Sequence, residues 1–216
     1  MKDYDAYLFD WDGTLAKSHD MWLEIMRSQI GQHAITLTDE QIVRQLFGRY
    51  DDGMRELGFS DKEITALTVE LEALAKSQYP LVDLFPNARQ VLELLKVRGK
   101  KLALVTATYR DVVNVAVTHH ALLELFDVTV AGDEMQAQKP DPSGLIIVLE
   151  RLHILPNRAV MIGDSPKDLL AAANAGTDSI LFYPPEHETQ HPLKELQKCN
   201  PIYTVRSWQE LLDQLQ

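Results

Sequence analysis

The chain reads Ala6-Tyr7-Leu8-Phe9-Asp10-Trp11-Asp12-Gly13-Thr14 near its N-terminus, and this stretch decides the fold. Residues 4–9 form a short apolar run that ends in carboxylates, which is typical of a buried parallel strand. The two-residue spacing of Asp10 and Asp12 could send both carboxylates toward one side, and Gly13 permits a sharp turn. Two acids this close repel each other unless a cation lies between them. The pair therefore indicates either a Mg²⁺ site or a strand end that turns through solvated acids.

Similar apolar runs recur along the chain and alternate with segments of helical length. The further strands are expected at residues 101–106, 126–130, 159–162, 179–183 and 202–205, and the helices at residues 86–97, 111–125, 142–152, 166–175 and from 207 onward. Proline in the first helical turn and glycine after the last turn support these assignments. The alternation predicts an α/β fold with a doubly wound, Rossmann-like parallel sheet.

Residues 16–82 interrupt this alternation, because they contain only helical signals. Asp20 is placed to cap a helix that runs to Ile30, Thr38 with Gln41 opens a second helix, and Ser60 opens a third. We therefore expect a helical cap at residues 16–82, inserted into a catalytic core formed by residues 1–15 and 83–216. Hinges after residue 15 and near residues 81–85 would let such a cap open and close.

Polar residues follow three later strands at the point where each strand is expected to end. Thr106 and Ala107 offer a hydroxyl and backbone N–H groups to an anion, Lys139 offers a positive charge, and Asp164 and Asp168 lie about one helical turn apart. Each signal alone has an ordinary explanation, such as a helix cap or an exposed loop lysine. Ligands bind beyond the carboxyl ends of strands in open α/β sheets, so the four signals together predict a site for phosphoryl transfer.

With these residues in this order, the chain resembles the haloacid dehalogenase superfamily, in its phosphatase branch with a phosphoglycolate phosphatase-like helical cap. The resemblance implies a Mg²⁺-dependent phosphomonoesterase that works through an aspartyl-phosphate intermediate. It also implies a role for each matching residue: Asp10 as the nucleophile, Asp12 as the general acid and base, Thr106 with Ala107 and Lys139 as phosphate-binding groups, and Asp10, Asp12, Asp164 and Asp168 as the metal-binding set.

Other activities of the same superfamily stay open as alternatives. Sugar-phosphate mutases usually have a histidine near the position of Trp22 and an acid at Gly163, and this chain has neither. Haloacid dehalogenases lack the acid-base residue, so Asp12 argues against that activity. Phosphonate hydrolases place a reactive lysine in the cap, a role for which Lys17 is a candidate. A phospho-acceptor or binding scaffold without enzymatic activity is the alternative of a different class, and Asp12 argues against it too.

The run from His187 to His191 matches the zinc metalloprotease pattern His-Glu-x-x-His. That chemistry needs both histidines on one face of a helix. Pro184 and Pro185 precede the run and Pro192 follows it at once, which disfavours a continuous helix. We therefore expect a chance match in a surface loop.

Composition and charge limit the function classes. The 216 residues carry a formal net charge of -11, which opposes binding to a nucleic acid polymer. The longest apolar runs are too short to cross a bilayer, and the N-terminus shows no secretion signal. The single cysteine, Cys199, fits a reducing compartment, so a cytoplasmic location is expected. The expected partner is a small phosphorylated metabolite.

Substrate choice is expected to depend on the cap. Lys17 could attract an anionic substrate, and Arg49, within residues 48–52 between two cap helices, could reach a second anionic group. Phosphoglycolate, a sugar phosphate, a nucleoside monophosphate and pyrophosphate all fit these features. The pattern of residues does not predict the oligomeric state.

Overall fold

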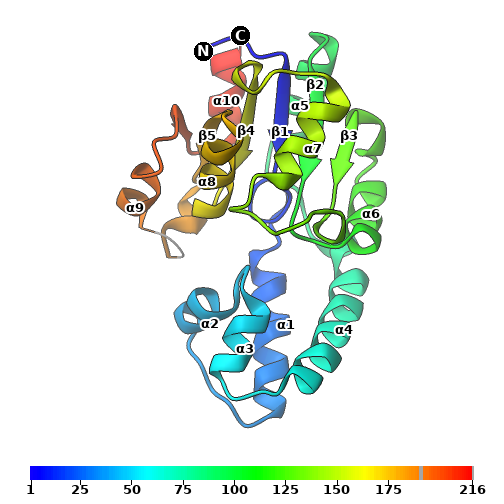
Figure 1. Ribbon diagram of the computed structural model, residues 1–216, viewed down its shortest axis with the longest axis vertical. Coiled ribbons are helices and arrows are strands. Elements are labelled where there is room, and N and C mark those ends of the chain that lie inside the picture. Colours follow the sequence, from blue (N-terminus) through cyan, green and yellow to red (C-terminus); the bar gives the residue numbers. More distant parts are fainter. Residues whose placement is uncertain (190–191, 216) are drawn as a thin grey trace.

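The computed structural model describes residues 1–189 and 192–215, in which one six-stranded sheet is the main element (Figure 1). Every pair of neighbouring strands in the described residues is parallel, and the strand order is β3-β2-β1-β4-β5-β6. The strands are β1 (Ala6–Phe9), β2 (Lys101–Val105), β3 (Val128–Val130), β4 (Ala159–Gly163), β5 (Asp178–Phe182) and β6 (Tyr203–Val205). The predicted doubly wound α/β fold is confirmed.

Helices cover both faces of the sheet, and alternate strand residues divide between the two faces. Tyr7 and Phe9 of β1 belong to a core shared with α5 (Ala88–Val97), α6 (Arg110–His119) and α10 (Trp208–Leu215). Ala6 and Leu8 face a second core with α7 (Ser143–Leu152) and α8 (Pro166–Ala175). Because the strands are covered on both sides, they read as continuous apolar runs rather than as alternating ones. A short helix, α9 (Leu193–Gln197), lies between β5 and β6 along the chain.

Some predicted helix boundaries are wrong, because the backbone conformation at those positions starts or ends the helix elsewhere. The helix expected over residues 111–125 ends at His119, because Ala121 adopts a positive φ of 48°, and only a short 3₁₀ turn, η2 (Leu123–Leu125), follows. The helix expected from residue 86 begins at Ala88, after Asn87 in the left-handed region. Single 3₁₀ turns also occur at η3 (Gly132–Glu134) and η4 (Pro156–Arg158).

The inserted segment forms a separate group of helices beside the sheet (Figure 1). The helices are α1 (His19–Gln32), α2 (Asp39–Leu46), α3 (Tyr50–Glu56) and α4 (Asp61–Gln78). The capping boxes expected at Thr38 and Ser60 are present. Ser18 takes the N-cap position of α1 in place of Asp20, which lies in the first turn. Residues 50–52 begin α3. Of the expected connection at residues 48–52, only residues 48 and 49 lie between α2 and α3.

The two chain segments that join the helices to the sheet run side by side. Ala16 and Leu84 form an isolated antiparallel bridge, the Lys17 N–H donates to the Asp83 carbonyl at 2.9 Å, and the Phe85 N–H donates to the Leu15 carbonyl at 2.9 Å. A 3₁₀ turn, η1 (Tyr79–Leu81), precedes the second segment. This paired connection lies where the hinges were expected, and their movement stays a prediction.

Within the part of the chain that the structure describes, the search for a helix with the length and hydropathy of a membrane span finds none.

Candidate active site

The site lies at the carboxyl ends of the central strands, where the strand order reverses. The chain leaves β1 for β2 and β3 on one side, and it later returns to place β4 on the other side. Phe9 is in register with Ile162, and the Asp10 N–H donates to the Ile162 carbonyl at 3.0 Å. Asp10 after β1 and Asp164 after β4 therefore flank a topological switch point, which is where ligands bind in such sheets.

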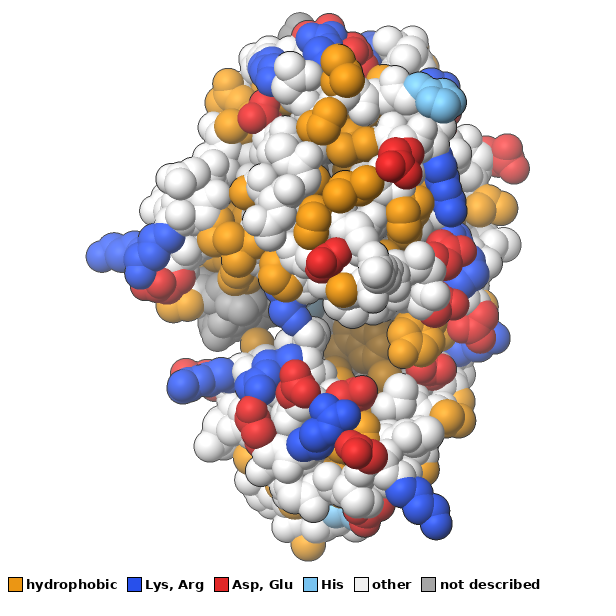
Figure 2. Space-filling view, viewed as in Figure 1, with side chains coloured by type: hydrophobic (Ala, Val, Ile, Leu, Met, Phe, Trp, Pro, Cys, Tyr) orange, Lys and Arg blue, Asp and Glu red, His pale blue; other side chains and the backbone are white. Residues whose placement is uncertain are grey.

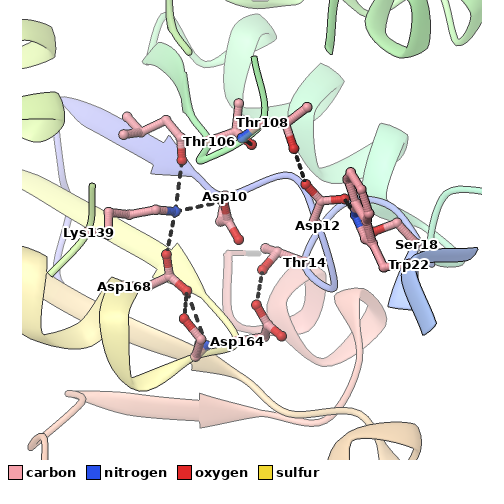
Figure 3. Close-up of polar contacts among 12 residues, drawn as sticks. Asp10, Asp12, Thr14, Ser18, Trp22, Thr106, Thr108, Lys139, Asp164 and Asp168 are labelled. Carbon is pink, nitrogen blue, oxygen red and sulfur yellow. Dashed lines mark hydrogen bonds and ion pairs between the residues drawn. The ribbon is translucent and has the colours of Figure 1, made fainter. Parts of the chain in front are cut away.

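Lys139 connects the acids at the centre of the site (Figure 3). Its ammonium Nζ donates to Asp10 Oδ1 at 2.7 Å, to Asp168 Oδ1 at 2.6 Å and to the Val105 carbonyl at 3.0 Å. Its side chain is 5% exposed. Burial alone would lower the pKa of Lys139, but the two carboxylates outweigh burial and raise it above the ordinary value. The lysine is therefore a fixed positive charge beside Asp10.

Three carboxylates share this buried space: oxygens of Asp10, Asp164 and Asp168 all lie within 4.8 Å of one another. Burial raises the pKa of Asp10 to about 7, because the nearby Lys139 offsets only part of the desolvation and Asp168 adds repulsion. Burial, followed by repulsion from Asp168 and Asp10, raises the pKa of Asp164 well above its ordinary value. A cluster with more negative charge than one lysine neutralises fits a hard divalent cation with oxygen ligands.

Asp168 has both carboxylate oxygens engaged by the protein. Oδ1 accepts from Lys139, and Oδ2 accepts from the Ser165 N–H at 3.1 Å and the Ser165 hydroxyl at 2.6 Å. Ser165 and Asp168 thereby form the capping box at the start of α8. Asp164 instead accepts from the Thr14 hydroxyl at 3.1 Å through Oδ1. The two acids that follow β4 thus differ in their partners: Asp168 holds Lys139, whereas Asp164 is held by Thr14.

Asp12 points away from Asp10, toward the connection with the helices (Figure 3). Its Oδ2 accepts from the Thr108 hydroxyl at 2.7 Å. Its Oδ1 accepts from the Ser18 hydroxyl at 2.6 Å, the Trp22 indole N–H at 2.8 Å and the Tyr79 hydroxyl at 2.5 Å. Four donors therefore fix the orientation of this carboxylate, and three of them come from the inserted segment.

These partners of Asp12 could not be predicted from the sequence. Ser18, Trp22 and Tyr79 lie in the N-cap of α1, in α1 itself and in η1, and Thr108 follows β2. No motif marks them, because their convergence depends on how the helices pack over the sheet.

The predicted phosphate-binding residues lie at the end of β2. Thr106 is fully buried, and its hydroxyl accepts from the Thr108 N–H at 3.1 Å. Ala107 follows in an exposed turn before α6. Thr106 and Lys139 thus reach the same edge of the sheet as Asp10 and Asp164, as the sequence predicts.

The two predicted specificity residues lie outside the cluster of Asp10, Asp164 and Asp168. Lys17 lines a groove of about 310 Å³ at the hinge and lies 3.5 Å from Glu186. Arg49 forms a two-point ion pair with Glu56 of α3. The Lys167 ammonium donates to the Gly48 carbonyl, so α8 contacts the α2–α3 connection directly. Figure 2 shows a recess between the helices and the sheet domain, with hydrophobic, basic and acidic side chains around it.

The expectation of a surface loop at His187 is wrong. His187 lies in the 3₁₀ turn η5 (Pro185–Thr189) and is 2% exposed. Its ring contacts Phe85 and Phe182 edge-on at centroid distances of 5.9 and 6.2 Å. Apolar packing between the turn and the sheet therefore draws this histidine inward. The second histidine of the pattern, His191, lies outside the described residues.

Replacing Lys139 with methionine should destabilise the protein strongly. The variant would leave two buried carboxylates without their cation. Their unpaired charge should lower the free energy of unfolding by about 3–5 kcal/mol at neutral pH. Urea unfolding of Lys139→Met, beside the exposed-lysine control Lys62→Met, measures this loss. Equal stability of the two variants would contradict the central role of Lys139 in the acid cluster.

Replacing Tyr79 with phenylalanine should lower turnover while preserving the fold. The ring stays, but Asp12 loses a hydrogen bond to a charged oxygen, worth about 1.5–3 kcal/mol, so we expect a decrease in kcat of about tenfold or more. Tyr203→Phe, at a tyrosine 40% exposed on β6, is the matched control. Unchanged kcat in Tyr79→Phe would mean that this hydroxyl does not help to position Asp12.

Comparisons with known proteins agree with this geometry. The family model described as haloacid dehalogenase-like hydrolase matches residues 7–182. A phosphoglycolate phosphatase from Psychrobacter arcticus is 30% identical over 233 residues, covering 99% of this chain and 96% of that protein. A validoxylamine A 7'-phosphate phosphatase from Streptomyces hygroscopicus is 29% identical, covering 80% of this chain and 83% of that protein.

A solved structure shares the fold. The HAD-superfamily hydrolase from Geobacter sulfurreducens superposes with a TM-score of 0.73 at 21% identity, covering 98% of this chain and 99% of that one. The family model spans most of the chain, and the curated relatives are phosphatases. The chain therefore belongs to the haloacid dehalogenase-like hydrolases, in their phosphatase branch.

Proposed function

We propose that the protein is a Mg²⁺-dependent phosphomonoesterase that hydrolyses a small phosphorylated metabolite through an aspartyl-phosphate intermediate on Asp10. The observation that carries the proposal is the buried contact of Asp10 with Lys139 at the end of β1, beside Asp164 across the switch point. A nucleophilic carboxylate needs positive charge close by, because the phosphoryl group that it attacks is itself anionic.

Each residue of the site has its own role in the proposed reaction. Asp10 attacks phosphorus in line, and Lys139 offsets the charge on the phosphoryl oxygens. Thr106 and the Ala107 N–H bind the same oxygens. Asp12 protonates the leaving oxygen and then accepts a proton from the water that hydrolyses the intermediate. Four hydrogen bonds, three of them from the inserted segment, hold the Asp12 carboxylate in its orientation beside the site, so these donors position the acid-base residue.

The metal would be held by Asp10, by Asp164 and by the backbone carbonyl of Asp12. When bound, Mg²⁺ supplies positive charge to the phosphoryl oxygens and orients them. Asp168 fits a supporting role better than direct coordination, because Lys139 and Ser165 already occupy both of its oxygens. Asp168 would then act by holding Lys139 in place.

The substrate class is a small phosphomonoester, with phosphoglycolate as the first candidate because relatives of similar length carry that name. Hydrolysis is favoured over mutase chemistry by the backbone at Gly163. A Cβ there would lie 2.4 Å from the Asp168 side chain, so the acid that mutases usually have at this position does not fit the present arrangement. The cytoplasmic location stays a prediction.

A panel of phosphorylated metabolites, assayed for phosphate release with and without Mg²⁺, tests the proposal. The panel holds phosphoglycolate, sugar phosphates, nucleoside monophosphates and pyrophosphate. We expect Mg²⁺-dependent release from at least one phosphomonoester and loss of activity upon chelation. Release of halide from a haloacid without metal would instead support the dehalogenase alternative.

Mg²⁺ should stabilise the folded protein. Binding at about 100 times the dissociation constant raises the free energy of unfolding by about 2.7 kcal/mol, because the unfolded chain does not assemble the acid cluster. Thermal unfolding with and without Mg²⁺ measures the effect. Asp164→Asn should abolish it, while Asp20→Asn, at an exposed position in α1, should leave it intact. An equal Mg²⁺ effect in Asp164→Asn would place the cation elsewhere.

A further inference from the structure

A second group of potential metal ligands adjoins the acid cluster. His19 Nε2 lies 3.5 Å from Asp164 Oδ2, and His187 Nδ1 lies 3.6 Å from the same oxygen. The two imidazole rings are 4.7 Å apart between centroids. One ligand atom from each of these three residues lies within 4.8 Å of the other two.

These separations suit a small tetrahedral ion. Zinc binds histidine nitrogen and carboxylate oxygen at about 2.0–2.2 Å, so two ligand atoms of a tetrahedral site lie about 3.4 Å apart. The two histidine-to-carboxylate distances are close to this value. Two imidazoles and one carboxylate are a donor set for a borderline transition metal, whereas Mg²⁺ prefers oxygen ligands only.

The surrounding structure fixes His187 and leaves room for the other two side chains to meet. His187 is buried against Phe85 and Phe182. His19 lies directly over Gly13, where an added Cβ would come within 2.4 Å of its Nε2 and within 2.5 Å of Asp164 Oδ2. Gly13, which has a φ of 72°, therefore leaves the space in which the imidazole and the carboxylate meet.

We propose that His19, His187 and Asp164 form a second metal site that binds a borderline divalent transition ion such as Zn²⁺. His19 belongs to α1, whereas Asp164 and His187 belong to the sheet domain, so a bound ion would link the helices to the sheet. Asp164 is also a ligand in the proposed Mg²⁺ site. Zn²⁺ would therefore compete for this carboxylate, hold the hinge and lower the phosphatase activity.

The site differs from the metalloprotease pattern that His187 begins. In that pattern both histidines come from one helix, but here the second imidazole comes from His19, far away in the sequence. The site goes beyond the proposed phosphatase activity, and no hydrolytic role is assigned to the transition ion.

Titration of the full chain with Co²⁺, without Mg²⁺ and without substrate, tests the proposal. Tetrahedral Co²⁺ absorbs visible light much more strongly than octahedral Co²⁺, so the spectrum reports the coordination, and displacement by Zn²⁺ gives the zinc affinity. We expect one tetrahedral ion per chain. His19→Asn and His187→Asn should each weaken binding at least about tenfold, because the loss of an outer-shell partner alone costs that much.

Two controls separate this site from its neighbours. His119→Asn, at an exposed histidine in α6, should bind Zn²⁺ like the native chain. Asp10→Asn removes the proposed nucleophile and an oxygen ligand of the acid cluster but none of the three donors, so it should also keep Zn²⁺ binding. Circular dichroism of each variant checks the fold, and His19 is the safer of the two test positions because its side chain is 18% exposed.

Binding of Zn²⁺ with native affinity by His19→Asn, in a variant that is folded like the native chain, would overturn the proposal. A purely octahedral Co²⁺ spectrum that disappears in Asp10→Asn would also overturn it, because the ion would then occupy the acid cluster. Neither result depends on phosphatase activity. Failure of this proposal and failure of the proposed function are therefore distinguishable.

Discussion

Asp10→Asn is expected to lower kcat/KM for phosphate-ester hydrolysis by at least about 10⁴-fold, the scale on which enzymes lose activity with their nucleophile. The substitution preserves the size of the side chain but removes the attacking oxygen anion, the partner of Lys139 and a proposed metal ligand. Phosphate release under saturating Mg²⁺ measures the loss.

The control for this prediction is Asp20→Asn, an exposed position in α1 that should retain native activity. The fold of Asp10→Asn should be preserved, since the substitution also relieves repulsion within the acid cluster. Activity within tenfold of the native chain would remove Asp10 from the nucleophile role.

Asp12→Asn is expected to lower kcat by about 10²–10⁴-fold, the usual contribution of a general acid and base. With p-nitrophenyl phosphate, a substrate whose leaving group needs little protonation, the first step should survive better than the second. The variant should therefore release an initial burst of nitrophenol, up to one equivalent per enzyme, and then stall as a phosphorylated enzyme.

Stopped-flow absorbance measures the burst. Tyr79→Phe, which removes one donor from Asp12 but keeps the carboxylate, should show a smaller decrease in kcat and no accumulation of phosphorylated enzyme. Steady turnover of Asp12→Asn at the native rate would contradict the acid-base role.

The central part of the fold follows from short-range patterns in the sequence. Apolar runs predict the strands, and the carboxyl ends of parallel strands meet at one edge of the sheet. The polar residues after each strand could therefore be predicted to converge, and the contact of Lys139 with Asp10 and the proximity of Asp164 follow this logic.

The rest depends on tertiary packing, which no local pattern encodes. Trp22 and Tyr79 reach Asp12 only because the inserted helices pack over the end of β1. His187 is drawn inward by contacts with Phe85 and Phe182, although the neighbouring prolines suggested an exposed loop. Asp168 is an aspartate, a common metal ligand, but its oxygens already accept hydrogen bonds from Lys139 and Ser165.

The most direct test of the central claim is to locate the phosphoryl group on the enzyme. Asp12→Asn, incubated with p-nitrophenyl phosphate and Mg²⁺, is quenched in acid, digested and analysed by mass spectrometry. One phosphoryl group is expected on the peptide that contains Asp10, at Asp10 itself. A phosphoryl group on another residue, or hydrolysis that proceeds at the native rate with no phosphorylated enzyme, would contradict it.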